Sequence, residues 1–317
     1  MSGMIIHTGE ALIDFIPVRD AGGRTAFFPA PGGSPYNASI AVARLEAPAA
    51  FFGRISRDFF GDQLMQGLVE NGVATDLVVR DDAPSTLAFV KKNDRGEARY
   101  AFFAQGSADR LLQPEDLPEL PESTQAIQFG SIALIPDPVG STILSLAEHC
   151  RGRCVVSFDP NIRASLVADE DAYRQRIRRA VLASTIVKVS DEDLLWMSGS
   201  SDLAESAQTL LAQGPSLVIV TEGGQGSRAY SRDHSVQVPA EKASVADTIG
   251  AGDSFHAALL AWLYHSDALN EQSVGELGRE KLEEMLRFAG AVAAKTCSRA
   301  GADPPRLSEV QTRFRSW

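Results

Sequence analysis

The sequence has few cysteines, an excess of negative charge and no long apolar run, and each of these features excludes a class of protein. Only three cysteines occur among 317 residues, too few and odd in number for a disulfide-stabilised secreted domain. His149, Cys150 and Cys154 lie close together. A zinc site would need a fourth ligand, so we expect reduced cysteines that are buried or incidental.

The net charge of −11 disfavours nucleic acid and anionic membranes as partners. It also means that an anionic substrate must be held by local donors and metal ions. No apolar run approaches the roughly 18 to 20 residues of a membrane span. The first residues lack the basic region and apolar core of a secretory signal, so we expect a cytoplasmic protein with no membrane partner.

Short β-rich runs alternate with helical patterns along most of the chain. The expected strands are residues 5–9, 50–55, 126–131, 155–159, 186–190 and 216–221. The expected helices are residues 35–45, 60–71, 139–149, 171–183 and 203–212. This alternation predicts an α/β fold with a mostly parallel sheet, in which ligands gather beyond the carboxyl ends of the strands.

Two regions interrupt the alternation and have the pattern of β-hairpins. Residues 12–18 and 25–30 flank a Gly-Gly turn, and residues 86–92 and 99–104 flank a polar turn at 93–96. We expect the two hairpins to form one small sheet attached to the main domain.

No internal repeat, low-complexity tract or linker divides the sequence, so we expect a single domain over residues 1–317. The hairpins, at about residues 12–30 and 86–104, are insertions in that domain. Their sheet can act as a lid that excludes water from a reaction site beneath it. It can also form the contact of a homodimer, and one sheet can do both.

The most informative stretch runs from Asp247 to Asp253, where Gly250, Ala251 and Gly252 form a turn. Apolar residues at positions 255, 259, 262 and 263 predict a helix with one buried face. The first N–H groups of a helix lack intrahelical acceptors, so this junction can bind an anion. Asp253 would repel a bound phosphate, which makes sense if it deprotonates a hydroxyl that attacks that phosphate. A plain helix N-cap is the other interpretation.

A second glycine-rich element follows the strand expected at 216–221. Thr221, Gly223 and Gly226 lie where backbone amides can meet the phosphates or ribose of a nucleotide. Taken alone, the element can equally be a strand-to-strand turn. Neither a P-loop nor a dinucleotide fingerprint occurs in the sequence.

A third element lies near the N-terminus and suits a polyol. Gly32 and Gly33 permit close approach, and Asn37 offers a donor and acceptors on the first turn of the expected helix. Asp14 follows the first strand and can accept two hydroxyl hydrogen bonds. Alone, these polar residues indicate no function; they indicate a polyol site only in combination with the two phosphate-binding elements.

These elements, with the Asp-Pro-Asn-Ile-Arg run at 159–163, closely resemble the ribokinase-like carbohydrate kinases of the phosphofructokinase-B type. The resemblance covers nearly the whole chain, from Gly9 to Ala302. It implies a three-layer α/β/α fold with a small β-sheet lid, a sugar substrate, ATP as phosphoryl donor, and Mg²⁺. In such enzymes the equivalent of Asp253 is the base, and residues 250–252 supply the anion hole.

The resemblance also implies roles for other positions. The nucleotide-facing positions are Asn161, Ser190, Thr221, Gly223 and Gly226. The sugar-facing positions are Asp14, Gly32, Gly33, Asn37 and Phe102. By the same resemblance, Arg163 lies near the transferred phosphate, where its rigid guanidinium group supplies positive charge.

The metal positions depart from the family pattern. Many relatives hold magnesium through water with an Asn-x-x-Glu motif, whereas this chain has Ser at 190 and Asp at 193. Asp193 and Glu192 both offer oxygen to a hard cation, and the choice between them stays open. Potassium often activates relatives near the first Asp of the Asp-Thr-x-Gly run, so Asp247 is the expected position for K⁺.

The sugar is indicated by three short runs. Residues 9–14, 86–90 and 107–109 look most like fructokinases, although kinases of 2-keto-3-deoxygluconate share much of this pattern. Relatives usually carry Arg just before Ser107, where this chain has Phe-Ala-Gln-Gly at 103–106. A charged hydrogen bond contributes about 1.5–3 kcal/mol, so losing this cation favours a neutral ketohexose such as fructose.

Three alternatives remain at this point. Two are kinases of the same family, one for 2-keto-3-deoxygluconate and one for a nucleoside. The third is a non-catalytic sugar sensor. The intact Asp253 speaks against the sensor, because a sensor gains nothing from a base beside an anion hole.

Overall fold

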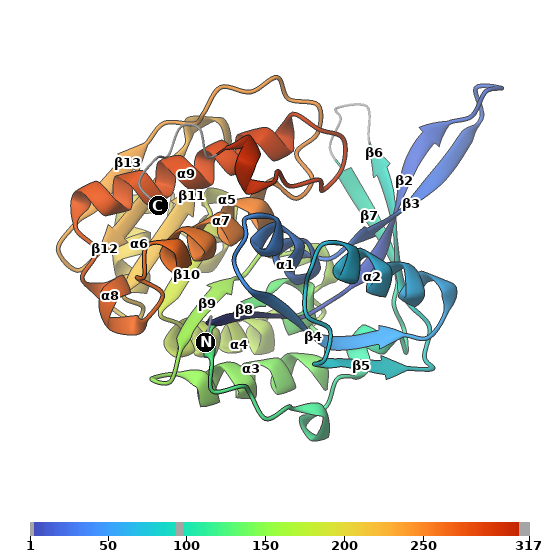
Figure 1. The fold of residues 1–317 in the computed structure, drawn as a ribbon, viewed down its shortest axis with the longest axis horizontal. Helices are drawn as coiled ribbons and strands as arrows, with labels where there is room; N and C mark the ends of the chain where they lie inside the picture. The colour runs from blue at the N-terminus through green and yellow to red at the C-terminus, as the bar shows by residue number, and fades with distance from the viewer. Residues whose placement is uncertain (1–2, 93–97, 311–317) are drawn as a thin grey trace.

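The structure, a computed structural model, describes residues 3–92 and 98–310 (Figure 1). Within these ranges nine strands form the main sheet, in the spatial order β13 (Ser235–Val238), β12 (Ser227–Ser231), β11 (Leu217–Thr221), β10 (Ile186–Ser190), β9 (Val155–Asp159), β8 (Thr124–Gly130), β1 (Met4–Thr8), β4 (Ala49–Ser56) and β5 (Val78–Asp81). The strands from β11 to β5 run parallel, and β12 and β13 are antiparallel additions at one edge. The predicted mostly parallel sheet is confirmed.

Helices cover both faces of this sheet (Figure 1). One layer consists of α1 (Ser34–Arg44), α2 (Phe59–Glu70), α7 (Ala251–His265) and α9 (Arg279–Cys297). The other consists of α3 (Val139–Cys150), α4 (Glu170–Ala183), α5 (Asp191–Ser198) and α6 (Leu203–Leu211). A short helix, α8 (Glu271–Gly275), lies between α7 and α9 in the chain. Among the described helices, none has the length and apolar character needed to cross a bilayer.

Alternation along the strands creates two separate cores. Ile5 and Phe51 pack in the core beneath α1, α7 and α9, whereas their neighbours Ile6 and Phe52 pack in the core beneath α3, α4 and α6. Successive side chains of a strand point to opposite faces, and parallel strands covered on both sides are therefore apolar throughout. The three-layer α/β/α architecture expected from the sequence follows from this pattern.

A second, four-stranded sheet forms the lid, in the order β3 (Thr25–Gly32), β2 (Leu12–Arg19), β6 (Thr86–Lys92) and β7 (Ala98–Phe103). It extends from the main sheet beside α2 (Figure 1). Both predicted hairpins are confirmed as strand pairs, and the turn predicted at 93–96 lies outside the described residues.

The register of the lid sheet gives its two faces different characters. Asp14 lies opposite Ala88, and Ala88 lies opposite Phe102. Ala88 and Phe102 pack with Ile132 of the main domain, so Asp14 lies on the face that is turned toward that domain. Phe15 lies on the opposite face of the lid.

Candidate active site

The polar residues of the main sheet gather where its parallel strands end. On the face beneath α1 and α7, apolar side chains give way to Asp159 at the end of β9, Lys188 near the end of β10 and Thr221 at the end of β11. The carboxyl ends of parallel strands share one edge of a sheet. The fold therefore brings these side chains to the edge where α7 begins and the lid is attached.

Asp253 lies on the first turn of α7, buried with 9% of its surface exposed. Its Oδ1 accepts a hydrogen bond of 2.7 Å from Ser34 Oγ, and its Oδ2 accepts one of 2.9 Å from Asn37 Nδ2. The N-cap position of α7 belongs to Gly250, with φ 75°, and no side chain caps this end. The N-cap interpretation of Asp253 is therefore wrong, because its carboxylate is directed to α1 instead of to its own helix.

The carboxylates around this point have raised pKa values. Burial raises the pKa of Asp253, the hydrogen bonds from Ser34 and Asn37 lower it, and Asp159 raises it further. Burial, together with the charge of Asp253, raises the pKa of Asp14 to about 6, against a lowering effect of Arg163. A carboxylate with a raised pKa is a stronger base, so Asp253 is suited to accept a proton.

The first turn of α1 depends on a glycine and on a buried acid that the sequence reading did not select. Gly33 has φ 109°, and a Cβ there would lie 2.5 Å from the carbonyl oxygen of Glu10. The side chain of Glu10 accepts hydrogen bonds from the N–H groups of Ser34 (3.0 Å) and Ala133 (3.3 Å). Burial raises the pKa of Glu10 to about 7. Glu10 thus fixes the start of α1 against the segment after β8.

Gly32 has a related steric function. A Cβ at this position would lie 2.4 Å from Asp14 Oδ2. The absence of a side chain lets the carboxylate of Asp14 lie directly over the backbone of β3. The predicted sugar-side residues Asp14, Gly32, Gly33 and Asn37 therefore belong to one connected region.

A buried ion pair lies beneath the first turn of α7. Lys188 Nζ donates a hydrogen bond of 2.8 Å to Asp159 Oδ2. Burial lowers the pKa of Lys188, but the carboxylates of Asp159, Asp193 and Asp253 together more than offset this, so the pKa is raised and the ammonium stays charged. A Cβ at Gly252 would lie 3.2 Å from Lys188 Nζ. The cation therefore lies next to the backbone of the predicted anion hole.

The sequence reading missed Lys188, although one signal was available. A lysine within Ile186-Val187-Lys188-Val189 interrupts a strand that is otherwise apolar. Such a charge is rarely buried without a partner. The partner, Asp159, belongs to the run at 159–163 that the sequence did single out.

The loop after β9 holds Arg163 in a defined place. Arg163 donates hydrogen bonds to the side chain of Asn161 (2.6 Å) and to backbone carbonyls of the same loop. Asn161 has φ 39°, in the left-handed region that Asn enters more readily than most residues. The charge of Arg163 acts on Asp14 and on Asp193, so it lies between the lid side and the β10 side of the site.

The two acids proposed for magnesium differ in position. Asp193 accepts a hydrogen bond from the N–H of Ile162 at 3.1 Å. Burial and then the charge of Asp159 raise its pKa to about 6. Glu192, by contrast, is exposed to solvent. Asp193 is thus the acid that faces the site.

Asp247 connects two loops. Its Oδ1 accepts hydrogen bonds from the N–H groups of Thr248 (2.8 Å) and Ile249 (3.2 Å), and its Oδ2 accepts one from Gly301 (3.2 Å). These contacts hold the segment before α7 against the segment after α9. Among the described residues, no group of three or more His, Cys, Asp or Glu side chains is arranged as a metal site.

A cavity of about 470 Å³ lies on the other side of the α7 N-terminus. Thr221, Gly223 and Gly226 line it together with Ala251 and Gly252. A Cβ at Gly223 would meet no protein atom within 4 Å, so its backbone is open to a ligand. The rest of the cavity wall includes small and apolar residues of α9 and of the segment after β13, namely Leu286, Gly290, Ala293, Ala294, Cys297, Ala243 and Val245.

The residues predicted to face the nucleotide therefore fall into two groups. Thr221, Gly223 and Gly226 line the cavity, and the glycine-rich element is also the turn between the antiparallel strands β11 and β12. Asn161 and Ser190 lie outside the lining of this cavity. Ser190 Oγ accepts the N–H of Asp193 at 3.0 Å as the N-cap of α5.

The buried carboxylate of Asp253 lies between a glycine-lined cavity and the polar side chains of Ser34 and Asn37. This arrangement suits a phosphotransferase that acts on an alcohol group, and the sequence comparisons identify the chain as such an enzyme. Residues 3–309 match the sequence profile of the pfkB family carbohydrate kinases. The chain belongs to this family.

Individual relatives agree with this assignment. The chain is 40% identical over 311 residues to a fructokinase of Rhizobium leguminosarum bv. trifolii, covering 98% of this chain and 90% of the relative. The structure is similar to that of a fructokinase with bound ATP from Xylella fastidiosa, with a TM-score of 0.91, 28% identity and 99% of both chains covered. It is also similar to a fructokinase from Vibrio cholerae O395 bound to fructose, ADP and calcium, with a TM-score of 0.81, 27% identity and coverage of 95% and 94%.

Proposed function

We propose that this chain is an ATP-dependent fructokinase, which transfers the γ-phosphate of ATP to a hydroxyl of fructose with Asp253 as the general base. The observation that carries the proposal is the position of Asp253. Its carboxylate contacts Ser34 and Asn37 on one side, and the preceding residue, Gly252, lines the cavity on the other. The names of the relatives support fructose as the acceptor.

The sugar lies between the lid and the start of α1 in this proposal. Asp14 and Asn37 hydrogen-bond its hydroxyls, Gly32 and Gly33 allow close approach, and Phe102 packs from the inner face of the lid. Two carboxylates, Asp14 and Asp253, face this region, and the charge of Asp253 raises the pKa of Asp14. A sugar acid would add a third negative charge, so the electrostatics favour a neutral ketohexose.

ATP lies in the cavity lined by Thr221, Gly223 and Gly226 in this proposal, with its γ-phosphate at the start of α7. The N–H groups at residues 250–252 are the donors proposed for the transferred phosphate; that of Ala251 would exchange its 3.3 Å hydrogen bond to the carbonyl of Thr248 for one to the phosphate. Arg163 supplies positive charge from the opposite loop, beside Asn161 and Ser190. The use of ATP makes the cytoplasm the proposed location.

Asp253 takes the proton of the acceptor hydroxyl as that hydroxyl attacks the γ-phosphate in line. Ser34 and Asn37 hold both carboxylate oxygens until the sugar arrives. The amides of residues 250–252, with Lys188 beneath them, stabilise the charge that develops on the phosphoryl oxygens. Proton removal and charge stabilisation thus occur within one turn of α7.

The acids beside the phosphate position suit a hard cation. Asp193 and Asp159 lie close enough to raise the pKa of Asp193, and both offer oxygen ligands of the kind that Mg²⁺ prefers. Asp193 is the residue that we propose holds Mg²⁺, directly or through water. The ion, bound with ATP, neutralises phosphate charge. Potassium near Asp247 stays a prediction, to be tested by activity with and without K⁺.

Replacement of Ser34 by alanine should shift the pH dependence of kcat/KM for fructose. The hydroxyl of Ser34 stabilises the charged form of Asp253, so its loss raises the pKa of that carboxyl. Because the reaction needs the deprotonated form, the acid limb should move to higher pH, by about one to two units for a charged hydrogen bond of about 1.5–3 kcal/mol. Ser39→Ala, which removes a hydroxyl bonded to the carbonyl of Tyr36 on the same helix, should leave the limb in place. An unchanged limb in Ser34→Ala would show that Asp253 is not the group that titrates.

A substrate panel tests the proposed function. ADP release should be measured with fructose, other neutral sugars, 2-keto-3-deoxygluconate and nucleosides as acceptors. We expect the highest kcat/KM with fructose. A preference for the sugar acid or for a nucleoside would select another kinase of this family. Fructose binding in a calorimeter without ADP release from any acceptor would support the sensor.

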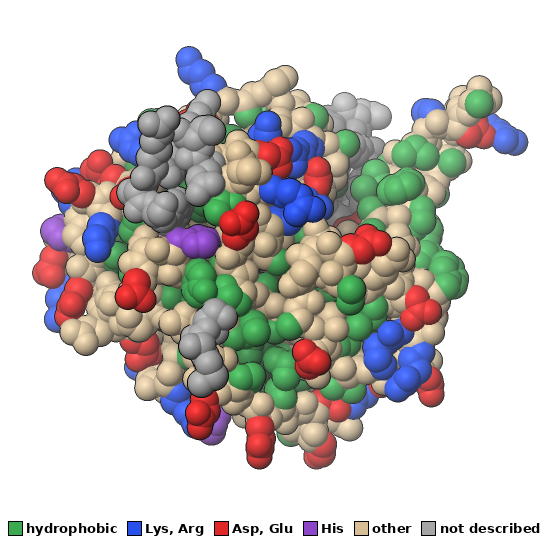
Figure 2. Space-filling model, viewed as in Figure 1, with side chains coloured by type: hydrophobic (Ala, Val, Ile, Leu, Met, Phe, Trp, Pro, Cys, Tyr) green, Lys and Arg blue, Asp and Glu red, His purple; other side chains and the backbone are tan. Residues whose placement is uncertain are grey.

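We further propose that the outer face of the lid forms a homodimer contact. Phe15 stacks on Phe89 with ring centroids 4.5 Å apart, and Phe27 and Phe103 pack edge-on against Phe89. Phe27 and Phe103 nevertheless remain 43% and 64% exposed. Figure 2 shows hydrophobic surface along the lid strands. An aromatic patch of this kind favours a protein contact.

Phe27→Glu combined with Phe103→Glu should lower the mass in solution from dimer to monomer, because each substitution places a charge in the aromatic patch. Light scattering after size exclusion measures this mass. Leu182→Glu, at an apolar residue of α4 that is 44% exposed, is the matched control and should keep the wild-type mass. A monomeric wild-type protein, or a double variant that stays dimeric, would refute the lid contact.

A further inference from the structure

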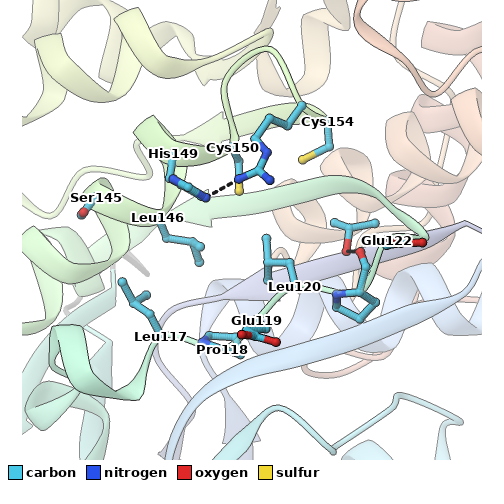
Figure 3. Close-up of a pocket in the computed structure, with 13 residues that line it drawn as sticks. Leu117, Pro118, Glu119, Leu120, Glu122, Ser145, Leu146, His149, Cys150 and Cys154 are labelled. Carbon is cyan, nitrogen blue, oxygen red and sulfur yellow. Dashed lines mark hydrogen bonds between the residues drawn. The ribbon is translucent and has the colours of Figure 1, made fainter.

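A second cavity, of about 640 Å³, lies at the amino ends of β8 and β9, and Figure 3 shows the residues that line it. It is bounded by residues 117–124, which lead into β8, and by the last turns of α3. Cys154, one residue before β9, completes its wall. The amino ends of β8 and β9 lie at the edge of the sheet opposite to Asp159. The proposed kinase site makes no use of this cavity.

Two cysteines line this cavity from the two ends of one tight turn. Cys150 is the last residue of α3, and its carbonyl accepts hydrogen bonds from the N–H groups of Arg153 (2.9 Å) and Cys154 (3.2 Å). Gly152, with φ 76°, allows the chain to close this turn. The thiol of Cys154 lies close enough to that of Cys150 for each to shift the pKa of the other. Figure 3 shows both side chains beside the turn that joins α3 to β9.

The surroundings distinguish the two thiols. The neighbouring thiol of Cys154 lowers the pKa of Cys150, burial opposes this, and the charge of Arg153 lowers it further. The neighbouring thiol of Cys150 and burial raise the pKa of Cys154. Arg153 also hydrogen-bonds His149 across the last turn of α3 (Figure 3). Of the two thiols, Cys150 therefore loses its proton more readily, and the thiolate is the reactive form of cysteine.

We propose that Cys150 and Cys154 form a redox-active dithiol that exchanges with small disulfides entering this cavity. The Cys150 thiolate attacks one sulfur of the incoming disulfide, which forms a mixed disulfide and releases one small thiol. Cys154 then loses its proton and attacks the sulfur of Cys150, which forms the intrachain disulfide and releases the second thiol. Two electrons pass from the two cysteines to the small disulfide, and their two protons are taken up by the released thiols.

The position of the pair determines what oxidation changes. The new bond closes a turn that is already folded, at the edge of the sheet remote from Asp253. We expect kcat for the kinase reaction to stay within about twofold of the reduced enzyme, because the bond alters no residue at the ends of β9 or β10. A failure of the dithiol proposal would therefore leave the proposed kinase function intact, and a failure of the kinase function would leave the dithiol proposal intact.

The test is oxidation of the reduced full-length protein by glutathione disulfide, followed by alkylation of free thiols and mass spectrometry. We expect the mass of the wild type to fall by two hydrogen atoms and the number of alkylated thiols to fall by two. Peptide mapping should find one disulfide, between Cys150 and Cys154. Cys154→Ser should instead accumulate one glutathionyl group on Cys150. Cys150→Ser should react at Cys154 about tenfold more slowly than Cys150 does in Cys154→Ser, because the reactive thiolate is absent. Cys297→Ser is the control and should oxidise as the wild type does.

Two results would overturn the proposal. One is a wild type that keeps all three thiols alkylatable, or stays as a mixed disulfide, after the oxidant has equilibrated. The other is equal adduct formation at Cys150 and Cys154 in the two single variants. A thermal unfolding scan of each serine variant separates altered reactivity from loss of folding, and the wild-type result decides the matter where a variant does not fold.

Discussion

Asp253→Asn should leave the protein folded and lower kcat for fructose by about 10²–10⁴, the usual contribution of a positioned general base. The asparagine keeps the size of the side chain, and its amide can still pair with Asn37 and Ser34. It cannot, however, accept the proton of the attacking hydroxyl. Steady-state ADP release measures the change in kcat, and circular dichroism verifies the fold.

Asp171→Asn is the matched control for this variant. Asp171 also lies in the first turn of a helix, α4, but is exposed to solvent and far from α7. Its replacement should change kcat by less than about twofold, as expected for a surface position. Near-normal turnover in Asp253→Asn would remove Asp253 from the mechanism.

Lys188→Met should weaken both the fold and the reaction. It leaves Asp159 buried without its cation, and removing one member of a buried ion pair destabilises a protein by about 3–5 kcal/mol. It also removes the positive charge beside Gly252, where we expect a loss of about 10²-fold in kcat, comparable to the loss of one oxyanion donor. Urea unfolding and ADP release measure the two effects separately.

A double variant separates the two functions of Lys188. Asp159→Asn combined with Lys188→Met removes both charges, so it should regain part of the free energy of unfolding but none of the turnover. Lys281→Met, on the exposed side of α9, should alter neither quantity. If Lys188→Met unfolds like the wild type and turns over normally, the ion pair supports neither the fold nor the anion hole.

Much of the fold was predictable because its strands are short apolar runs with clear boundaries. The strands β9 and β10 were predicted with the bounds that the structure gives, and the lid strands were found from their turns. Helix α9 was missed, although it packs against α7 in the core. Its first half is rich in charge and Gly290 interrupts it, so its apolar face becomes evident only once α7 lies against it.

The candidate site was predictable in its glycine-rich elements and in Asp253, because those residues carry local signals. Ser34 and Glu10 carry no such signal. Ser34 acquires its function only when α1 and α7 pack together, and Glu10 only when β1 and β8 end side by side. Contacts between residues more than a hundred positions apart depend on the topology, which local patterns do not encode.

The pH dependence of a single turnover tests the central claim most directly. Enzyme saturated with ATP and Mg²⁺ is mixed with fructose in a rapid-quench device, and fructose phosphate is measured across the acid range. We expect the wild-type rate to rise with one ionisation whose pKa lies above the ordinary value of 3.8 for Asp, because burial raises the pKa of Asp253. The residual rate of Asp253→Asn should lack this ionisation. The same ionisation in both proteins would show that another group accepts the proton.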